Sequence, residues 1–302
     1  MSQVKIFCVY HKPARLYSSD CIEPIQVGCA NAKVDLGILR DDIGDNISSL
    51  NGECCELTAH YWVWKNYLPE HPDLEWIGFC HYRRFLDFKS PSLVASGTNS
   101  PFRFVSRDEF DSAIFPSYNE KTILEEISSV CDIALPRRFM VEGAHSAIET
   151  YIYGLGGLGL REAIDTLKIH YKDYIVDFLS AEQDNHTYAA LTFLMKRAIF
   201  ERYASWMFSF MEKTRSAWRA SKNWANNARQ EGYVMEHLFN TWLKHEMRSE
   251  GSSIAEFDGL LLEDLRVPCG EIPMWNFFER AKSIVAWKLA KLNAAKMLKG
   301  VK

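Results

Sequence analysis

The 302-residue sequence predicts an α/β protein in which helices flank a layered, mainly parallel sheet. Short β-rich runs recur along the chain at 5–10, 75–80 and 131–135. They alternate with stretches whose apolar residues recur at helical spacing, such as 56–67 and 197–215. Strands that alternate with helices favour a mainly parallel, layered sheet.

The N-terminal third supplies the clearest elements. Residues 5–10 (KIFCVY) predict a buried first strand, as is usual at the start of an α/β sheet. Turn-forming and polar residues dominate 40–51, which predicts a loop. The apolar spacing of 56–67 then predicts a helix, and 75–80 (EWIGFC) a second strand.

Later elements follow the same pattern. Residues 131–135 predict a third strand that Pro136 stops, and part of 190–195 predicts another strand. A helix is expected over 197–215. Residues 90–108 are rich in Ser, Pro, Gly and Asn and predict a long surface loop.

Composition and motifs exclude several classes of protein. Hydrophobic residues are 47% and charged residues 25%, which excludes a disordered or fibrous chain. The eight cysteines contain no C-x-x-C pair and lie mostly in apolar contexts, so we expect reduced core thiols and no zinc site. P-loop, G-x-S-x-G, H-E-x-x-H and Asp-x-Asp motifs are absent. No apolar run is long enough to span a bilayer.

One glycine run imitates a nucleotide-binding motif. Residues 154–159 (GLGGLG) satisfy G-x-G-x-x-G formally. A dinucleotide fingerprint follows a strand in a βαβ unit, whereas the region here is helical. A flexible glycine turn is therefore favoured over a nicotinamide or flavin site.

Two polar clusters are candidates for ligand binding. The tetrapeptide His81-Tyr82-Arg83-Arg84 follows a predicted strand, and open α/β sheets bind ligands at the carboxyl ends of strands. Arginine pairs bidentately with phosphate, although one arginine could instead hold a carboxylate such as Asp87. The second cluster could bind sugar hydroxyls or could only form Asx turns and a helix cap; it comprises Asp41, Asp42, Asp45, Asn46, Ser48 and Asn51.

Several segments together resemble a known family. They include KIFCVYHKP, LRDDIGDNIS, CELTAHYWVWKN, IGFCHYRRF, DIALPRR and GYVMEHLFNTWL. The chain is similar, over roughly 4–245, to a domain-of-unknown-function family from bacterial capsule, exopolysaccharide and O-antigen gene clusters. Its members are treated as glycosyltransferases, some of them galactofuranosyltransferases.

The resemblance implies a GT-A-like glycosyltransferase domain over 1–270. It implies transfer of a sugar, galactofuranose being one candidate, from a UDP-linked donor to a surface-polysaccharide or lipopolysaccharide precursor. The HYRR segment occupies the place of the Asp-x-Asp motif, so we expect transfer without a metal or other cofactor, with fixed positive charge on the leaving diphosphate. The expected donor-binding residues are His11, Lys12, Asp45, Asn46, His81, Tyr82, Arg83 and Arg84.

An inverting transfer needs a carboxylate as general base. Glu236 is the first candidate, because GYVME resembles the glycine-led acidic segment that opens a late helix in GT-A enzymes; a first-turn glutamate stabilised by the helix dipole is the alternative. Asp184 is the second candidate, and a loop turn is its alternative.

The tail at 271–302 is basic, with no acidic residue after Glu279. A helical wheel predicts an apolar stripe, with lysines around much of the remaining circumference. We expect this helix to lie on the cytoplasmic face of the inner membrane, near a lipid-linked acceptor, or else to pack on the body as a terminal helix. The stripe comprises Trp287, Ala290, Ala294, Met297, Leu298 and Val301.

The remaining expectations concern partners and rival classes. The N-terminus lacks the features of a signal peptide, so a cytoplasmic location is expected, and no nucleic acid is expected as a partner. The main rival is a non-catalytic glycan-binding protein of a polysaccharide assembly complex, and an NAD-linked enzyme is a third class.

Overall fold

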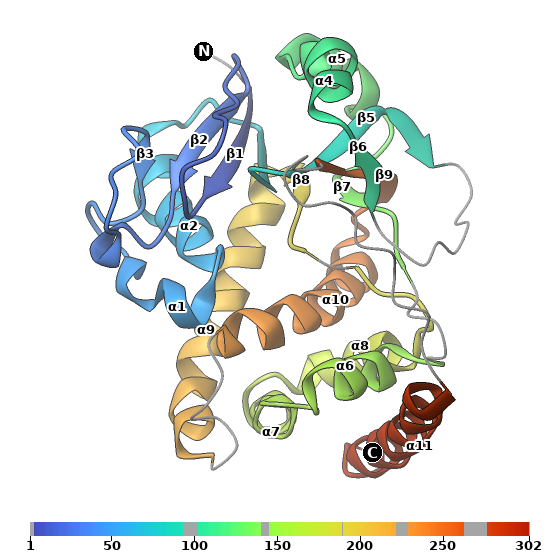
Figure 1. The fold of residues 1–302 in the computed structure, drawn as a ribbon. Coiled ribbons are helices and arrows are strands. Elements are labelled where there is room, and N and C mark those ends of the chain that lie inside the picture. Colours follow the sequence, from blue (N-terminus) through green and yellow to red (C-terminus); the bar gives the residue numbers. More distant parts are fainter. Residues whose placement is uncertain are drawn as a thin grey trace.

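The computed structural model describes residues 3–92, 102–139, 145–188, 190–221, 229–262 and 277–301. One nine-stranded sheet organises these residues, with the strand order β3-β2-β1-β4-β5-β9-β7-β8 and with β6 beside β9. Figure 1 shows the sheet in the upper half of the molecule and most of the helices below it. The strands are β1 (Val4–Tyr10), β2 (Ile22–Gln26), β3 (Leu39–Arg40), β4 (Trp76–His81), β5 (Arg84–Ser92), β6 (Phe102–Val105), β7 (Ile133–Pro136), β8 (Phe193–Lys196) and β9 (Ile254–Leu262).

The two halves of the sheet differ in strand direction. Strands β3, β2, β1 and β4 are all parallel, as the sequence predicted. The second half is mixed, because β5 runs antiparallel to β4 and β9, and β8 antiparallel to β7 and β4. A two-residue hairpin joins β4 to β5, and such a short connection permits only antiparallel pairing. A mainly parallel sheet is therefore correct for the first half alone.

Helices cover both faces of the sheet (Figure 1). The predicted helix over 56–67 forms as α2 followed by a π-helical turn, and the predicted helix from 197 is longer than expected. The α-helices are α1 (Asn51–Cys54), α2 (Leu57–Trp62), α3 (Leu68–Glu70), α4 (Arg107–Glu109), α5 (Glu120–Ile127), α6 (Ala147–Leu155), α7 (Leu160–His170), α8 (Ile175–Gln183), α9 (Arg197–Ala220), α10 (Gln230–Glu250) and α11 (Phe277–Lys299). The π-helices are Val63–Tyr67 and Phe110–Ile114, and 3₁₀ turns lie at Cys29–Asn31, Ser48–Leu50, Phe115–Ser117 and Lys172–Tyr174.

Strand β1 shows how the sequence builds two cores. Phe7 and Val9 point to one face and pack with the core beneath α2, α9 and α10. Ile6 and Cys8 point to the other face and pack with the core that α5 covers. Successive side chains of a strand alternate between faces, so one strand that is apolar apart from Lys5 serves both cores.

Two segments depart from their predicted form. The loop expected over 90–108 is flanked by strand at both ends, because β5 continues through Ser92 and β6 occupies 102–105; the stretch between them, 93–101, lies outside the described residues. The glycine run follows α6 rather than a strand, and Gly156, Gly157 and Gly159 all adopt positive φ. It is a helix–turn–helix junction, as the glycine-turn interpretation predicted.

The C-terminal helix packs on the body. Ala290 and Ala294 of α11 are buried in the main core, beside α6, and Val301 is buried just beyond the helix. Met297 and Leu298 pack against the same core, and Gly157 approaches Met297. The described part of the predicted apolar stripe is therefore covered by protein and not free to enter lipid, which fits the alternative of a terminal helix packed on the body. Contact of α11 with a membrane stays a prediction, and the side chain of Trp287 lies outside the described residues.

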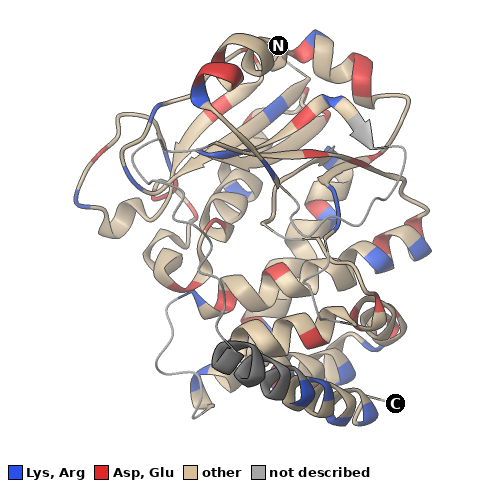
Figure 2. Ribbon diagram, turned by 45° about the vertical axis from the view of Figure 1, so that its right-hand side comes forward, with Lys and Arg blue, Asp and Glu red and all other residues tan. Residues whose placement is uncertain are grey.

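The outer face of α11 is basic. Lys288, Lys291, Lys296 and Lys299 are exposed, as are Leu289 and Leu292. Figure 2 shows the basic residues along this helix near the C-terminus. Within the described residues no helix is long and apolar enough to cross a membrane.

Candidate functional site

The candidate site is a cleft of about 470 Å³ at the carboxyl ends of β1 and β4. The parallel register pairs Val9 with His81, so the two strands end side by side. Residues from α1 and from the start of α10 close the other side. The lining residues are Val9, His11, Lys12, Val27, Asn51, Gly52, Cys55, Glu56, His81, Tyr82, Arg83, Arg84 and Arg229.

A tight hairpin carries the HYRR segment into this cleft. His81 pairs with Arg84 across the hairpin, which leaves Tyr82 and Arg83 at its tip. The Tyr82 N–H donates to the Val9 carbonyl at 3.2 Å, and the Arg83 carbonyl accepts from the Leu262 N–H at 2.8 Å. The Tyr82 ring is buried, so backbone bonds and packing together fix the positions from which both arginines project.

The cleft carries excess positive charge. Lys12, Arg83, Arg84 and Arg229 line it, against the single carboxylate of Glu56. Within the described part of the chain, no carboxylate lies within ion-pair distance of Lys12, Arg83 or Arg84, although other arginines of the protein are paired. Cations that lie near one another without carboxylate partners suit an anionic ligand, and a diphosphate fits because each arginine can hold two oxygens.

His81 and Glu56 lie together at the inner end of the cleft. His81 Nε2 is 3.8 Å from Glu56 Oε1, and both side chains are largely buried. Burial, together with the positive charge of Arg84, lowers the pKa of His81 to about 3, so its imidazole is neutral at pH 7. Burial raises the pKa of Glu56. His81 is thus a neutral hydrogen-bonding group and adds no cation to the cleft.

His11, in the loop after β1, belongs to the same electrostatic environment. Burial lowers its pKa, and the neighbouring charges of Lys12 and Arg229 lower it further. The positive charges of Lys12 and Arg229 thus disfavour protonation of His11, which indicates a positive electrostatic potential in the cleft.

Glu236 lies beside this group and is held by the backbone. It sits in the second turn of α10, which begins at Gln230, so it is not a first-turn glutamate. Its Oε1 accepts from the Ala190 N–H at 2.9 Å. Burial, together with the negative charge of Glu56, raises the pKa of Glu236 to about 7, while the backbone bond and Arg84 act in the opposite direction. A carboxylate of this proton affinity is suited to general-base chemistry near neutral pH.

The backbone that holds Glu236 is strained. Ala190 and Leu191 both adopt positive φ, at 66° and 24°, which costs non-glycine residues free energy. The turn directs the Ala190 N–H toward the carboxylate of Glu236. Strained backbone of this kind persists only where the surrounding structure holds it in place. Here the strained turn fixes the position of the candidate base, Glu236.

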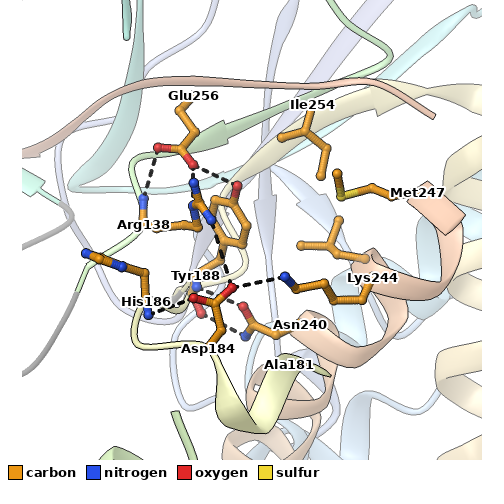
Figure 3. Close-up of a pocket in the computed structure, with 11 residues that line it drawn as sticks. Arg138, Ala181, Asp184, His186, Tyr188, Asn240, Lys244, Met247, Ile254 and Glu256 are labelled. Carbon is orange, nitrogen blue, oxygen red and sulfur yellow. Dashed lines mark hydrogen bonds and ion pairs between the residues drawn. The ribbon is translucent and has the colours of Figure 1, made fainter. Parts of the chain in front are cut away.

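Asp184 lies elsewhere, in a separate pocket (Figure 3). Its carboxylate accepts from Lys244 at 3.0 Å and from the His186 N–H at 3.2 Å. Burial alone would raise the pKa of Asp184, but these hydrogen bonds lower it below its usual value. A carboxylate so stabilised in its ionised form is a weak base, and it does not line the cleft.

Asp45 and Asn46 also lie outside the cleft. Asp45 accepts from the Tyr61 hydroxyl at 3.0 Å. Asn46 Nδ2 donates to the carbonyls of Asp42 and Gly44 at 3.1 and 2.8 Å. These bonds stabilise the turn itself, which is the structural alternative considered for the acidic cluster.

Two charged residues that line the cleft, Glu56 and Arg229, were missed by sequence reasoning. Glu56 was identified only as the start of a helix, and it occupies the N-cap position of α2 without a side-chain capping hydrogen bond. Arg229 precedes α10 in the left-handed conformation, with φ of 72°, and its N–H donates to the Gly52 carbonyl at 2.8 Å. That long-range bond brings Arg229 to the cleft, and no local sequence motif predicts this contact.

No metal site accompanies the cleft in the described residues, where no three His, Cys, Asp or Glu side chains converge as ligands. The cleft therefore offers fixed side-chain charge, and the described chain offers no ligand set for a cation. What it can do chemically is bind an anion next to a carboxylate of near-neutral proton affinity.

Comparison with solved structures shows which class of protein the fold resembles. The chain is similar to the apo structure of the bifunctional glycosyltransferase WbbM, with 29% identity and a TM-score of 0.72. The similarity covers 87% of this chain but 46% of that one, so the protein spans less than half of the WbbM chain. The fold is thus glycosyltransferase-like.

The family follows from the sequence match. The chain belongs to the family described as Domain of unknown function (DUF4422), whose model matches residues 5–247. The resemblance inferred from sequence segments is confirmed at this level. No curated protein matches the chain.

Proposed function

We propose that the protein transfers a sugar from a nucleotide-sugar donor to a glycan hydroxyl during polysaccharide synthesis. The observation that carries the proposal is the cleft, which Lys12, Arg83 and Arg84 line without carboxylate partners among the described residues. Glu236 does not itself line the cleft, but it interacts electrostatically with the lining residues Arg84 and Glu56. The likeness to a bifunctional glycosyltransferase supports it. The donor class that we favour is UDP-linked, and galactofuranose is the candidate sugar.

The chemistry follows from the charges. Lys12, Arg83, Arg84 and Arg229 bind the diphosphate and stabilise the negative charge that develops as the bond between the anomeric carbon and phosphate oxygen breaks. The acceptor hydroxyl attacks that carbon from the opposite side, and Glu236 takes its proton. The electron pair of the broken bond leaves with the nucleoside diphosphate. The proposal is therefore an inverting transfer that needs no metal.

His81 and Glu56 have supporting roles in this scheme. Neutral His81 can donate a hydrogen bond to a phosphate oxygen, while the lysine and arginines of the cleft form the ion pairs with the diphosphate. Glu56 helps to raise the proton affinity of Glu236 through like-charge repulsion. The pair thus adjusts the base and the anion site together.

The acceptor is proposed to be a surface-polysaccharide or lipopolysaccharide precursor carried on lipid at the cytoplasmic face of the inner membrane. The exposed lysines and leucines of α11 support this, since the lysines can meet anionic headgroups. Co-sedimentation with anionic vesicles tests it. Binding that persists unchanged at high salt, or in a chain ending at Glu279, would exclude α11 as the contact.

The test of the function uses the full chain. Thermal unfolding is measured with UDP, GDP, CMP and dTDP, and the purified protein is then incubated with the matching nucleotide sugars. We expect UDP to raise the midpoint most, and slow release of UDP from a UDP-sugar. A protein that binds glycans but never cleaves any donor would be a non-catalytic glycan-binding protein.

A further inference from the structure

A second cavity, of about 190 Å³, lies outside the cleft. The end of α8, the segment after it, the second half of α10 and strand β9 enclose it. Figure 3 shows its polar side chains converging on one side and Met247 and Ile254 forming part of the opposite wall. The lining residues are Arg138, Ala181, Asp184, His186, Tyr188, Asn240, Leu243, Lys244, Met247, Ile254 and Glu256.

The charges of this pocket are balanced and paired. Arg138 Nε donates to Glu256 at 2.6 Å, and the Tyr188 hydroxyl donates to the same carboxylate at 2.9 Å. Lys244 donates to Asp184 at 3.0 Å. Two cations therefore meet two carboxylates, which leaves no net charge to attract a phosphate or a metal ion.

A neutral polyhydroxyl ligand suits this arrangement. Fixed carboxylates accept hydrogen bonds from hydroxyls, while the remaining N–H groups of Arg138 and Lys244 donate to them. The apolar wall of Leu243, Met247 and Ile254 offers a surface for the C–H face of a sugar ring. Groups already held by each other need little reordering when a ligand binds.

The pocket is connected to the candidate base through α10. Glu236, Asn240 and Lys244 recur at intervals of four residues, so they lie along one face, each about 6 Å farther along the axis. Asn240 exchanges two hydrogen bonds with the backbone of Tyr188, at 2.8 and 3.1 Å, and Glu236 binds the Ala190 N–H. The same polypeptide segment thus contacts both sites.

We propose that this pocket binds a sugar unit of the acceptor glycan, one or more units away from the reacting hydroxyl. The inference rests on the proposed function for its biological meaning, because an acceptor that reaches Glu236 can extend along α10 into the pocket. The binding site itself is defined by the pocket residues alone.

The test compares a pocket variant with a matched control. Met247 is about half exposed and lines the pocket, so Met247→Trp fills the cavity while leaving its ion pairs in place. Lys244→Gln removes the ammonium group that pairs with Asp184 and shortens the side chain. Lys121→Gln on α5 is its control, since Lys121 is highly exposed and lies on another element. Thermal unfolding confirms that each variant is folded.

Three disaccharide probes are used: lactose, cellobiose and the methyl glycoside of a galactofuranose disaccharide. Their binding is measured by saturation-transfer NMR, and UDP binding by calorimetry. We expect at least one disaccharide to bind the unmodified chain. Met247→Trp should weaken it about tenfold or more, Lys244→Gln by a similar factor, and Lys121→Gln not at all. UDP affinity should be unchanged in all three.

Two results would overturn the inference: no disaccharide binds the unmodified chain, or the bound one is retained fully by folded Met247→Trp. Failure of the proposed function would give a different set of results. In that case no nucleotide sugar is cleaved and UDP does not bind, while disaccharide binding remains sensitive to Met247→Trp.

Discussion

The two cavities are built from the same residue types in opposite ways. In the pocket, Arg138 and Lys244 each have a carboxylate partner within 3.0 Å. In the cleft, Arg83 and Arg84 have no such partner among the described residues, and the nearby carboxylates have raised pKa values. Paired charges stabilise the protein or orient a neutral ligand, whereas unpaired charges can bind a ligand of opposite sign.

The largest expected effect follows from removing the candidate base. Glu236→Gln keeps the hydrogen bond from Ala190 but cannot accept a proton, so transfer should fall by roughly 10²-fold or more. UDP affinity should stay within about twofold. Steady-state transfer rates and calorimetry measure the two quantities.

Asp184→Asn is the matched control for that variant. It changes a carboxylate of the pocket by the same single atom, and we expect donor cleavage with water as acceptor to persist. If donor cleavage survives in Glu236→Gln and disappears in Asp184→Asn, the roles assigned to the two sites are reversed.

Removing a cleft arginine should weaken donor binding next most strongly. Charge-assisted phosphate contacts contribute about 1.5–3 kcal/mol each, so Arg83→Ala and Arg84→Ala should each reduce UDP affinity about tenfold or more. Arg138→Ala in the pocket should leave UDP affinity unchanged. Equal UDP binding by all three variants and the unmodified chain would remove the cleft from the donor site.

The sequence predicted part of this comparison. Strands β1 and β4 and the HYRR segment after β4 were identified because continuous apolar runs and the polar residues that follow them are local signals. Glu236 was chosen from a resemblance, and the structure places it beside Glu56 and Arg84. Its role in catalysis remains a prediction.

The rest depended on contacts between distant segments. Asp45 and Asn46 have the residue types of a sugar site, but their partners Tyr61 and Asp42 decide that they stabilise a turn. Arg229 reaches the cleft through a bond to Gly52, which sequence spacing could not reveal. Residue type alone does not distinguish a paired charge from an unpaired one.

The same contrast predicts opposite pH behaviour for activity and stability. Glu236 must be ionised to accept a proton, and its pKa is about 7, so transfer should fall about tenfold per unit as pH drops below 7. Its pKa is raised on folding from 4.5 to about 7, so the stability it contributes is fully present below pH 4.5 and is lost progressively as pH rises to about 7.

The check is a pH profile of the transfer rate alongside urea unfolding at pH 6 and pH 8. The stability that Glu236→Gln gains relative to the unmodified chain should be larger at pH 8 than at pH 6, because the loss in the unmodified chain accumulates between pH 4.5 and about pH 7. A flat rate profile between pH 5.5 and 8 would contradict the assignment of Glu236 as the base.

A smaller effect is expected on the free energy of unfolding, which should differ between variants of the paired Arg138 and the unpaired Arg84. Arg138→Met leaves Glu256 without its closest cation, and we expect the free energy of unfolding to fall by about 1–2 kcal/mol. Arg84→Met removes a cation from a positively charged group and should leave that free energy unchanged or higher. Urea unfolding at pH 7 measures both, and equal losses would mean that Arg84 also has a structural partner.

The smallest expected effect is that of removing metal ions. If the cleft's fixed cations neutralise the leaving diphosphate, EDTA should change the transfer rate by less than about twofold, since no divalent cation then contributes to the transition state. The matched experiment is Arg84→Ala with added Mg²⁺ or Mn²⁺. A cation supplied in solution lacks a ligand set among the described residues, so it should not restore the lost donor affinity. Complete loss of transfer in EDTA, restored by either metal, would show that the cleft works as a metal-dependent site and that its unpaired arginines are insufficient.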